Sequence, residues 1–250
     1  MYGNLYLVST PIGNLEDLTF RAVKILSSVD IILAESVERT KKLLSHYNID
    51  AKVISFNKDN EKRKTKDAIV YLQNSKNLAL VSDAGTPSIS DPGFYLLSNI
   101  DEKVKIIPIP GVSSITCALS VSKIPMNGFT FLGFLPKKEN DRKNKLLKSS
   151  STELPICLFE SKHRILDLLE DISSIFGEDT MVGLFREMTK IYETITHKSV
   201  TEHISDLREN TPKGEFVIII APNRHVEIEK PYISIIKRLI LKNFSNKDIV

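Results

Sequence analysis

The sequence predicts an α/β protein made of two α/β domains, and three observations support this fold class. Apolar strand-like runs alternate with helical patterns in the first half of the chain, which indicates a mostly parallel sheet covered on both faces. The second half again mixes strands and helices, and proline and glycine cluster between residues 123 and 128. We therefore expect an N-terminal domain over residues 1–124, a C-terminal domain over 125–225 and a short helical tail over 226–250.

In the first domain, the expected strands are residues 5–8, 31–34, 53–55, 78–81 and 104–107. The clearest helical pattern covers residues 15–29, where apolar side chains recur with a period of 3.6 residues. Asn14 is expected to cap this helix, because Asp17 follows three residues later in the arrangement of a capping box. Further helices are expected at residues 37–47, 61–74 and 112–121.

In the second domain, apolar runs predict strands at residues 129–134, 156–160, 181–185, 192–196 and 215–221. The expected helices are residues 138–149, 163–176 and 200–209. A last helical pattern covers residues 232–243 in the tail. This order of elements is typical of a second α/β domain.

Composition excludes several classes of protein. A chain of 250 residues with 42% apolar residues can bury a full core, and it contains no run of 18 apolar residues that could span a membrane. Its beginning does not resemble a signal peptide. Cys117 and Cys157 lie in apolar surroundings without a CxxC pair, which predicts reduced core cysteines in a cytosolic protein. The five histidines have no metal-ligand spacing, so we expect no metal.

The most informative stretch is residues 80–93, LVSDAGTPSISDPG, which follows a buried-type strand. In open α/β sheets, ligands bind at the carboxyl ends of the strands. Two more glycine-containing loops, residues 9–14 and 108–114, also follow expected strands. Neither the dinucleotide fingerprint nor the P-loop pattern is present. The residues therefore predict a crevice for a small cofactor; a long surface turn is the alternative.

The net charge is only +3, but basic residues are clustered. The segment 137–148 holds six basic and two acidic residues, and smaller clusters lie at 58–66 and 237–247. Such clusters can attract a polyanion, although each could equally be a solvated helix face. Within the first segment, Lys143 and Lys145 are the residues we expect to contact an RNA backbone.

Six motifs occur in order along the chain: LYLVSTPIGNLEDLTFRA, LALVSDAGTPSISDPG, PIPGVSSITCALSVSKIP, FTFLGFLPKK, FESKHR and REMTKIYET. From residue 5 to about residue 221, the chain resembles the ribosomal RNA small subunit methyltransferase I family, in the tetrapyrrole methylase superfamily. The resemblance implies two domains of tetrapyrrole-methylase type, with S-adenosylmethionine in a crevice between them. It also implies a cytoplasmic homodimer that 2'-O-methylates a cytidine ribose in the decoding region of 16S rRNA.

The resemblance further implies which residues bind the cofactor. They are small or lie near turns, so backbone contacts are expected to dominate. The set is Pro11, Asp83, Ala84, Gly85, Thr86, Ser88, Ile89, Ser113, Ser114 and Leu158.

Methyl transfer requires the ribose oxygen, methyl carbon and sulfur in line, and a group that accepts the hydroxyl proton. The catalytic candidates are Glu160, His163 and Glu187. Each has a structural alternative: Glu160 could cap the following helix, His163 could be a partly buried helix-start residue, and Glu187 could pair with Arg186 between domains. The candidates for RNA contact are Asn14, Arg39, Lys143, Lys145, Arg164, Arg186 and Lys190, of which Asn14 could be only a cap.

Two segments depart from the family pattern. Where the family has AEDTR, this chain has Ala34-Glu35-Ser36-Val37-Glu38, and Arg39 is displaced by one position. Where the family has a histidine-containing SYHEHNE-like segment, this chain has SFNKDNE at 55–61. These segments are expected to face the substrate. Two alternatives therefore stay open: a related methyltransferase of a tetrapyrrole or modified protein residue, and an RNA-binding relative without catalysis.

Overall fold

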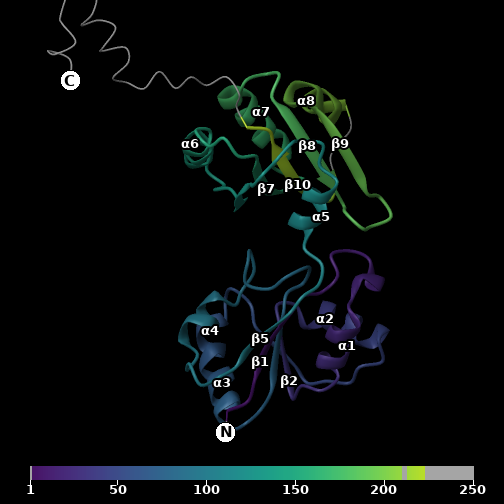
Figure 1. Cartoon of the computed structure of the whole chain (residues 1–250), viewed down its shortest axis with the longest axis vertical. Coiled ribbons are helices and arrows are strands. Elements are labelled where there is room, and N and C mark those ends of the chain that lie inside the picture. Colours follow the sequence, from purple (N-terminus) through teal and green to yellow (C-terminus); the bar gives the residue numbers. More distant parts are fainter. Residues whose placement is uncertain (1, 210–212, 223–250) are drawn as a thin grey trace, which may run out of the picture. The chain divides into compact units, whose positions relative to one another are not determined.

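The computed structural model describes residues 2–209 and 213–222, and Figure 1 shows the course of the chain. Two compact units are present. Among the described residues, the first consists of residues up to 122 and of 185–195, and the second consists of 123–184 and of the described residues from 196 to 222. The chain thus leaves the first unit next to the segment 123–128 that is rich in proline and glycine, and it returns for one short segment.

The first unit contains a five-stranded parallel sheet in the order β3-β2-β4-β1-β5. Its strands are β1 (Leu5–Val8), β2 (Ile31–Ala34), β3 (Val53–Ser55), β4 (Leu78–Val81) and β5 (Ile106–Ile109). The expected parallel α/β architecture is confirmed, and only β5 differs from its expected position, by two residues. Because β1 pairs with both β4 and β5, the loops that follow these three strands start side by side.

Helices cover both faces of this sheet (Figure 1). One core contains apolar residues of α1 (Phe20–Leu26) and α2 (Val37–His46). The other contains residues of α3 (Glu61–Gln73) and α4 (Phe94–Asn99). The last helix of the unit is the short α5 (Ser114–Ser120).

The expected helix over residues 15–29 is wrong in its first turn. Asn14 caps only the 3-10 turn η1 (Leu15–Asp17), where its Oδ1 accepts a hydrogen bond from Glu16 N at 3.1 Å. Leu18 is extended and buried, and this breaks the helical path. Thr19 then caps α1, its Oγ1 accepting from Ala22 N at 3.1 Å.

The second unit has a mixed sheet in the order β6-β7-β10-β8-β9. Its strands are β6 (Thr130–Phe134), β7 (Ile156–Ser161), β8 (Met181–Arg186), β9 (Thr194–Ser199) and β10 (Glu215–Ile220). β6 runs parallel to β7, whereas β10 is antiparallel to β7. Every expected strand is present, within three residues at either end. The helix expected at 232–243 lies outside the described residues.

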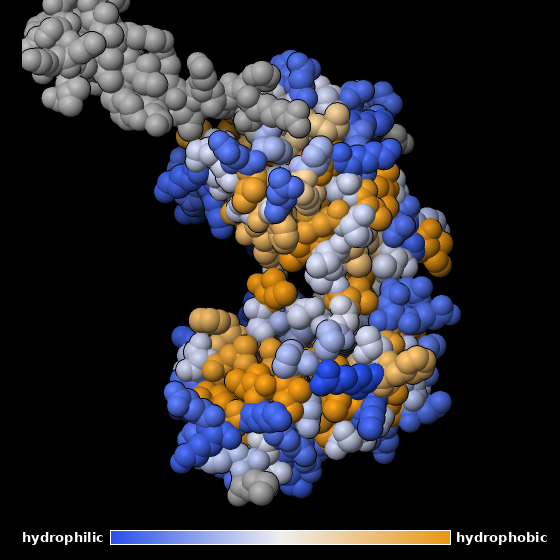
Figure 2. Space-filling model, viewed as in Figure 1, coloured by the Kyte–Doolittle hydropathy of each residue, from blue (hydrophilic) through white to orange (hydrophobic). Residues whose placement is uncertain are grey.

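The helices of the second unit are α6 (Glu139–Ser149), α7 (Ile165–Phe176) and α8 (Val200–Glu209). All three contribute to one core, together with alternate strand residues such as Ile156 and Leu158, so they cover the same face of the sheet. Figure 2 agrees, because hydrophilic residues gather over the helices of this unit and apolar residues over its strands. Within the described residues the two sheets thus differ: the first has helices on both faces, whereas α6, α7 and α8 all lie on one face of the second.

A buried ion pair joins α6 to α7. Arg142 Nε lies 2.5 Å from Asp171 Oδ2, and both side chains are only 5% exposed. Removing one partner of such a pair leaves an uncompensated buried charge, which costs about 3–5 kcal/mol. The pair therefore sets how α6 packs on α7.

Within residues 2–209 and 213–222, no helix is long and apolar enough to cross a membrane. The same residues contain no group of three histidine, cysteine, aspartate or glutamate side chains placed to hold a metal ion. Burial raises the pKa of the Cys157 thiol to about 12, so this cysteine is a protonated core residue.

Candidate active site

The loops after β1 and β4 are joined at the carboxyl edge of the first sheet. Thr10 and Gly85 exchange two backbone hydrogen bonds, with N···O distances of 2.9 and 3.0 Å. Thr10 Oγ1 also donates to the Ser82 carbonyl at 3.1 Å. Gly85 has a φ of 81°, a conformation that glycine adopts without strain. The loop that sequence analysis singled out is thus held against its neighbour by backbone contacts.

The loop after β5 joins the same cluster. Thr86 Oγ1 donates to the Val112 carbonyl at 3.3 Å and lies 2.9 Å from Ser9 Oγ, so Ser9 donates to Thr86. Gly111 packs directly on Ser9, because a Cβ built on this glycine would lie 2.9 Å from Ser9 Cβ. A side chain at this position would push the first and third loops apart. The three glycine loops therefore form one connected surface at the ends of β1, β4 and β5.

The far end of the central loop is anchored by α3. Glu61 Oε1 accepts hydrogen bonds from Gly93 N at 2.8 Å and from Tyr95 N at 3.2 Å, at the start of α4. Between the two anchors, Ser88 adopts a φ of 65° and Ile89 is 52% exposed. Non-glycine residues with positive φ gather at functional sites, where the surrounding structure enforces them.

Three carboxylates lie close together at this edge of the sheet. The pKa of Asp91 is raised to about 6, mainly by burial and next by the charge of Glu35. Burial also raises the pKa of Glu35, with the charge of Asp83 as the next cause. Lys58 opposes both shifts. Asp91 and Glu35 were not among the catalytic or binding residues expected from the sequence, where their only signal is a position directly after a strand or a loop turn.

The two segments that depart from the family pattern supply the cations of this cluster. Arg39 Nη1 lies 3.2 Å from Asp83 Oδ2, and Asp83 Oδ1 accepts from Ser36 N at 2.9 Å. Lys58 comes from the second departing segment. Arg39 thus reaches the central loop even though it is displaced by one position in the sequence.

The REMTK turn packs on the first loop, within the first unit. Thr189 Oγ1 accepts from Asn14 N at 3.2 Å, and a Cβ at Gly13 would overlap the Lys190 side chain. Glu187 and Thr189 have φ values of 51° and 65°. Glu187 Oε1 lies 2.9 Å from Lys190 Nζ. The structure thus brings together Asn14, Glu187 and Lys190, three residues that were candidates from the sequence.

Arg186 and the FESKHR segment lie elsewhere. Arg186 Nη2 donates to Thr194 Oγ1 at 3.0 Å. In the second unit, Glu160 is buried and its Oε1 accepts from Arg164 Nε at 2.9 Å and from Ser161 N at 2.6 Å. Arg164 Nη1 also donates to the Leu135 carbonyl at 3.2 Å. Glu160 therefore positions Arg164 across the ends of β6 and β7, while His163 is exposed.

The remaining candidates are spread over both units. Leu158 is fully buried in the core under α7, so its side chain is not available to a ligand. Pro11 is also buried, and Ala84 is exposed. Ser113 and Ser114 stand at the start of α5, where the Ser113 side chain makes no capping hydrogen bond.

The two lysines of α6 differ. Lys143 Nζ lies 2.5 Å from Glu139 Oε1 and 3.5 Å from Asp171 Oδ1. The hydrogen bond with Glu139 raises the pKa of Lys143. Lys145 is exposed and has no side-chain partner in the part of the chain that the structure describes. Of the pair, Lys145 is therefore the better placed to meet an anion.

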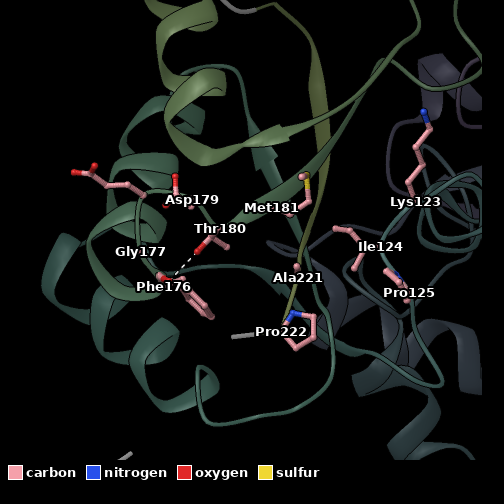
Figure 3. A pocket seen from close by; sticks show the side chains of 11 residues that line it. Lys123, Ile124, Pro125, Phe176, Gly177, Asp179, Thr180, Met181, Ala221 and Pro222 are labelled. Carbon is pink, nitrogen blue, oxygen red and sulfur yellow. Dashed lines mark hydrogen bonds between the residues drawn. The ribbon is translucent and has the colours of Figure 1, made fainter. Parts of the chain in front are cut away.

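A cavity of about 550 Å³ is present in the second unit (Figure 3). It is bounded by the end of α7, where Thr180 Oγ1 donates to the Phe176 carbonyl at 2.8 Å, and by Met181, Ala221 and Pro222. Because Ile220 pairs with Ile156 at the start of β7, the cavity opens at the sheet edge opposite to FESKHR. It lies away from every candidate site residue.

Comparison with known proteins identifies relatives over most of the chain. Residues 4–203 match the family model of tetrapyrrole (corrin/porphyrin) methylases. Ribosomal RNA small subunit methyltransferase I of Halalkalibacterium halodurans is 43% identical over 222 residues, which cover 88% of this chain and 76% of the relative. The protein of the same name from Buchnera aphidicola subsp. Schizaphis graminum is 43% identical over 248 residues, 97% of this chain and 87% of the relative.

Solved structures of low identity share the fold. Diphthine synthase superposes with a TM-score of 0.66 at 12% identity, covering 88% of this chain and 90% of that protein. Uroporphyrin-III C-methyltransferase from Thermus thermophilus, complexed with S-adenosyl homocysteine, has a TM-score of 0.60 at 14% identity and covers 87% and 97%. The expected fold of two α/β domains is therefore confirmed by structures as well as by sequence.

Proposed function

Because this chain belongs to the ribosomal RNA small subunit methyltransferase I family, we propose that it is an S-adenosylmethionine-dependent methyltransferase of 16S rRNA. The finer proposal is transfer of the methyl group to the ribose 2'-oxygen of a cytidine in the decoding region. The observation that carries the proposal is the joined surface of three glycine loops at the carboxyl ends of β1, β4 and β5. This is the place where open α/β sheets bind their ligands.

The residues at these loops suit S-adenosylmethionine. Gly85 and Gly111 have no side chain, so a small molecule can approach the backbone of these loops closely. The hydroxyls of Ser9 and Thr86 lie in the same cluster of loops. The carboxylates of Glu35, Asp83 and Asp91 have the charge that the sulfonium and ammonium groups of the cofactor require. When bound, the cofactor supplies an electrophilic methyl group. The chain's own task is to orient the reactants and to receive a proton.

The structure adds Asp91 to the candidates for that proton acceptor. A carboxyl with a pKa of about 6 is ionised at neutral pH and is more basic than an ordinary aspartate, which suits a general base. Glu187 belongs to the same unit but is paired with Lys190, and Glu160 is held by Arg164. His163, on the exposed FESKHR loop, is the fourth candidate.

Two further parts of the proposal concern assembly and place of action. A homodimer is supported by apolar residues on the surface of the first unit: Phe94 is 75% exposed, and Ile106 on the edge strand β5 is 43% exposed. Figure 2 shows apolar surface where Figure 1 draws β1 and β5. Analytical ultracentrifugation tests this: the wild-type chain should sediment as a dimer, and Ile106→Asp should sediment as a monomer. A protein that modifies ribosomal RNA is expected to work in the cytoplasm.

The function is tested on the purified chain in two steps. Calorimetry with S-adenosylmethionine is expected to show binding, and its absence would leave only the RNA-binding alternative. Labelled methyl transfer is then measured into small ribosomal subunits from cells that lack the gene. Mass mapping is expected to find one 2'-O-methylcytidine in 16S rRNA. Binding of the cofactor without rRNA labelling would favour a tetrapyrrole or protein substrate.

The proton acceptor is tested by the pH dependence of kcat. The wild-type rate is expected to rise with pH as Asp91 loses its proton, with an apparent pKa near 6. Asp91→Asn should lower kcat about 100-fold or more and remove this limb of the profile. Glu187→Gln is the matched comparison. If Glu187→Gln removes the limb and Asp91→Asn leaves it, Glu187 is the base.

A further inference from the structure

Strand β6 carries an irregularity that changes which side chains share a face. Phe131 pairs with Cys157, and Phe134 pairs with Phe159. Phe131 and Phe134 are three residues apart along β6, whereas Cys157 and Phe159 are only two residues apart along β7. The register shifts between Phe131 and Gly133, and Gly133 has a φ of 64°. In a regular strand, residues three apart point to opposite faces. The shift therefore places Phe131 and Phe134 on the same face of the sheet.

The result is a cluster of three phenylalanine rings, here called the aromatic platform: Phe131, Phe134 and Phe159. Phe159 makes an edge contact with Phe131 at 5.1 Å between ring centroids and a tilted contact with Phe134 at 5.5 Å. The platform lies on the face opposite the helices, because Ile156 and Leu158 face the helical core. Phe134 is nevertheless 55% exposed. A bulge that re-aims an aromatic ring and leaves it exposed is typical of a binding feature.

Basic loops follow the two strands of the platform. β6 leads into Lys137 and Lys138, and β7 leads into Lys162 and His163. Because β6 and β7 are parallel, these loops leave the same edge of the sheet, and Arg164 bridges them through its bond to the Leu135 carbonyl. The four loop residues Lys137, Lys138, Lys162 and His163 are exposed. Among the described residues, none of their side chains has a hydrogen-bond or ion-pair partner.

From this arrangement we propose that the aromatic platform and its basic loops form the RNA-binding surface of the second unit, with Phe134 stacking on an unpaired base. The inference rests on the proposed function and adds a surface to it. Aromatic side chains beside a positively charged groove are how proteins bind single-stranded RNA without reading long sequences. The platform also differs in place and chemistry from α6, where the basic residues Arg142 and Lys143 are already paired with Asp171 and Glu139.

Unpaired RNA is the occupant because the charge is one-sided. The two loops present lysines without acidic partners, and such cations attract a polyanion. A fully paired RNA helix offers no base to stack on, since its bases are stacked on one another. A rRNA target with a splayed base therefore fits both parts of the surface.

The experiment compares full-length variants for binding to small ribosomal subunits from cells lacking the gene and to a short single-stranded RNA. Phe134→Ala is expected to raise Kd for both RNAs about tenfold, since base stacking on one aromatic ring has that effect. Phe134→Tyr, which keeps the ring, should bind like the wild type. Leu147→Ala, at an exposed apolar residue of α6, is the matched control and should change nothing.

The loops are tested through salt dependence. Lys137→Ala combined with Lys138→Ala should lower the slope of log K against log salt by about 1.4, since each phosphate contact to a single strand contributes about 0.7. Lys103→Ala combined with Lys105→Ala, at two exposed lysines of the first unit, controls for net charge. S-adenosylmethionine affinity should stay unchanged in every variant.

Two results overturn the inference alone. If Phe134→Ala weakens cofactor binding instead of RNA binding, the platform is a cofactor wall. If Phe134→Ala binds RNA like the wild type while the wild type methylates rRNA, the surface lies elsewhere and only this inference fails. A wild-type chain that neither binds nor methylates rRNA would refute the proposed function itself, and the inference with it.

Discussion

The two units of this chain present chemically different surfaces at the ends of their parallel strands. The first unit offers backbone groups, small side chains and hydroxyls, held by close contacts such as Gly111 on Ser9. The second offers large aromatic rings and long basic side chains. A small cofactor needs atoms placed to a fraction of an ångström, which rigid backbone provides. A large RNA needs area and charge, which exposed side chains provide.

The largest expected effect tests whether the second unit depends on its buried ion pair. Asp171→Ala should lower the free energy of unfolding of that unit by about 3–5 kcal/mol, because the buried charge of Arg142 loses its carboxylate partner. Calorimetry should then show the second unit melting before the first. Asp167→Ala, an exposed position on the same helix, should change little. Replacing both partners by apolar residues, Arg142→Met with Asp171→Leu, should recover most of the loss.

The next effect tests whether the first unit needs close backbone contact. Gly111→Ala should weaken S-adenosylmethionine binding at least tenfold, because the new Cβ would force the first and third loops apart. Binding of single-stranded RNA should stay near the wild-type value. The control is Gly128→Ala in the second unit, where the nearest side-chain atom is 3.5 Å away. Equal loss in both variants would mean that the assay reports overall stability.

A smaller effect concerns the pH dependence of stability in the carboxylate cluster. The pKa of Asp91 is raised to about 6 in the folded protein, so the folded state holds this proton more tightly than the unfolded chain. Protonated Asp91 therefore favours the folded state, and its contribution to the free energy of unfolding is lost as the pH rises from about 4 through 6. Asp91→Asn should raise Tm at pH 7 by about 2 °C or more, with the gain vanishing near pH 4.

The control for this stability prediction is Asp50→Asn, at an exposed aspartate that is not among the charges acting on Asp91. Its Tm difference from the wild type should not vary over the same range. A gain for Asp91→Asn that is as large at pH 4 as at pH 7 would show that charge is not its cause.

The smallest effect separates two neighbouring lysines of α6. Lys145→Ala should lower the salt slope of RNA binding by about 0.7 if this lysine meets a phosphate. Lys143→Ala should leave the slope unchanged, because Glu139 and Asp171 already balance its charge. Binding titrations at several salt concentrations measure both. The reverse order would mean that RNA displaces Lys143 from its acidic partners.

Strands and most helices could be predicted because their signals are local. A parallel strand in an α/β sheet is buried on both faces, so it is apolar throughout, as residues 78–81 are. The helix α4 escaped prediction, since it has six residues and its start is held by Glu61 from another helix. The first turn of α1 was misplaced because burial of Leu18 overrides the capping signal of Asn14.

The candidate site could be predicted only in part, for a similar reason. Loops that follow strands can be found in a sequence, and the cluster of the three glycine loops was expected on that basis. Pairwise contacts could not be found, because Asp91 and Glu35 are far apart in sequence and acquire their raised pKa values from burial and from carboxylates of other segments. Likewise, a period-two pattern places Phe131 and Phe134 on opposite faces, and only the register shift reverses this.

Because of that register shift, β6 should tolerate the deletion of one residue better than the insertion of one. Loss of Leu132 would restore two steps between Phe131 and Phe134, so the rings would keep their common face. Gain of one residue between Gly133 and Phe134 would turn Phe134 toward the helical core and Leu135 away from it. Among homologous chains, deletions in this strand should therefore be found more often than insertions.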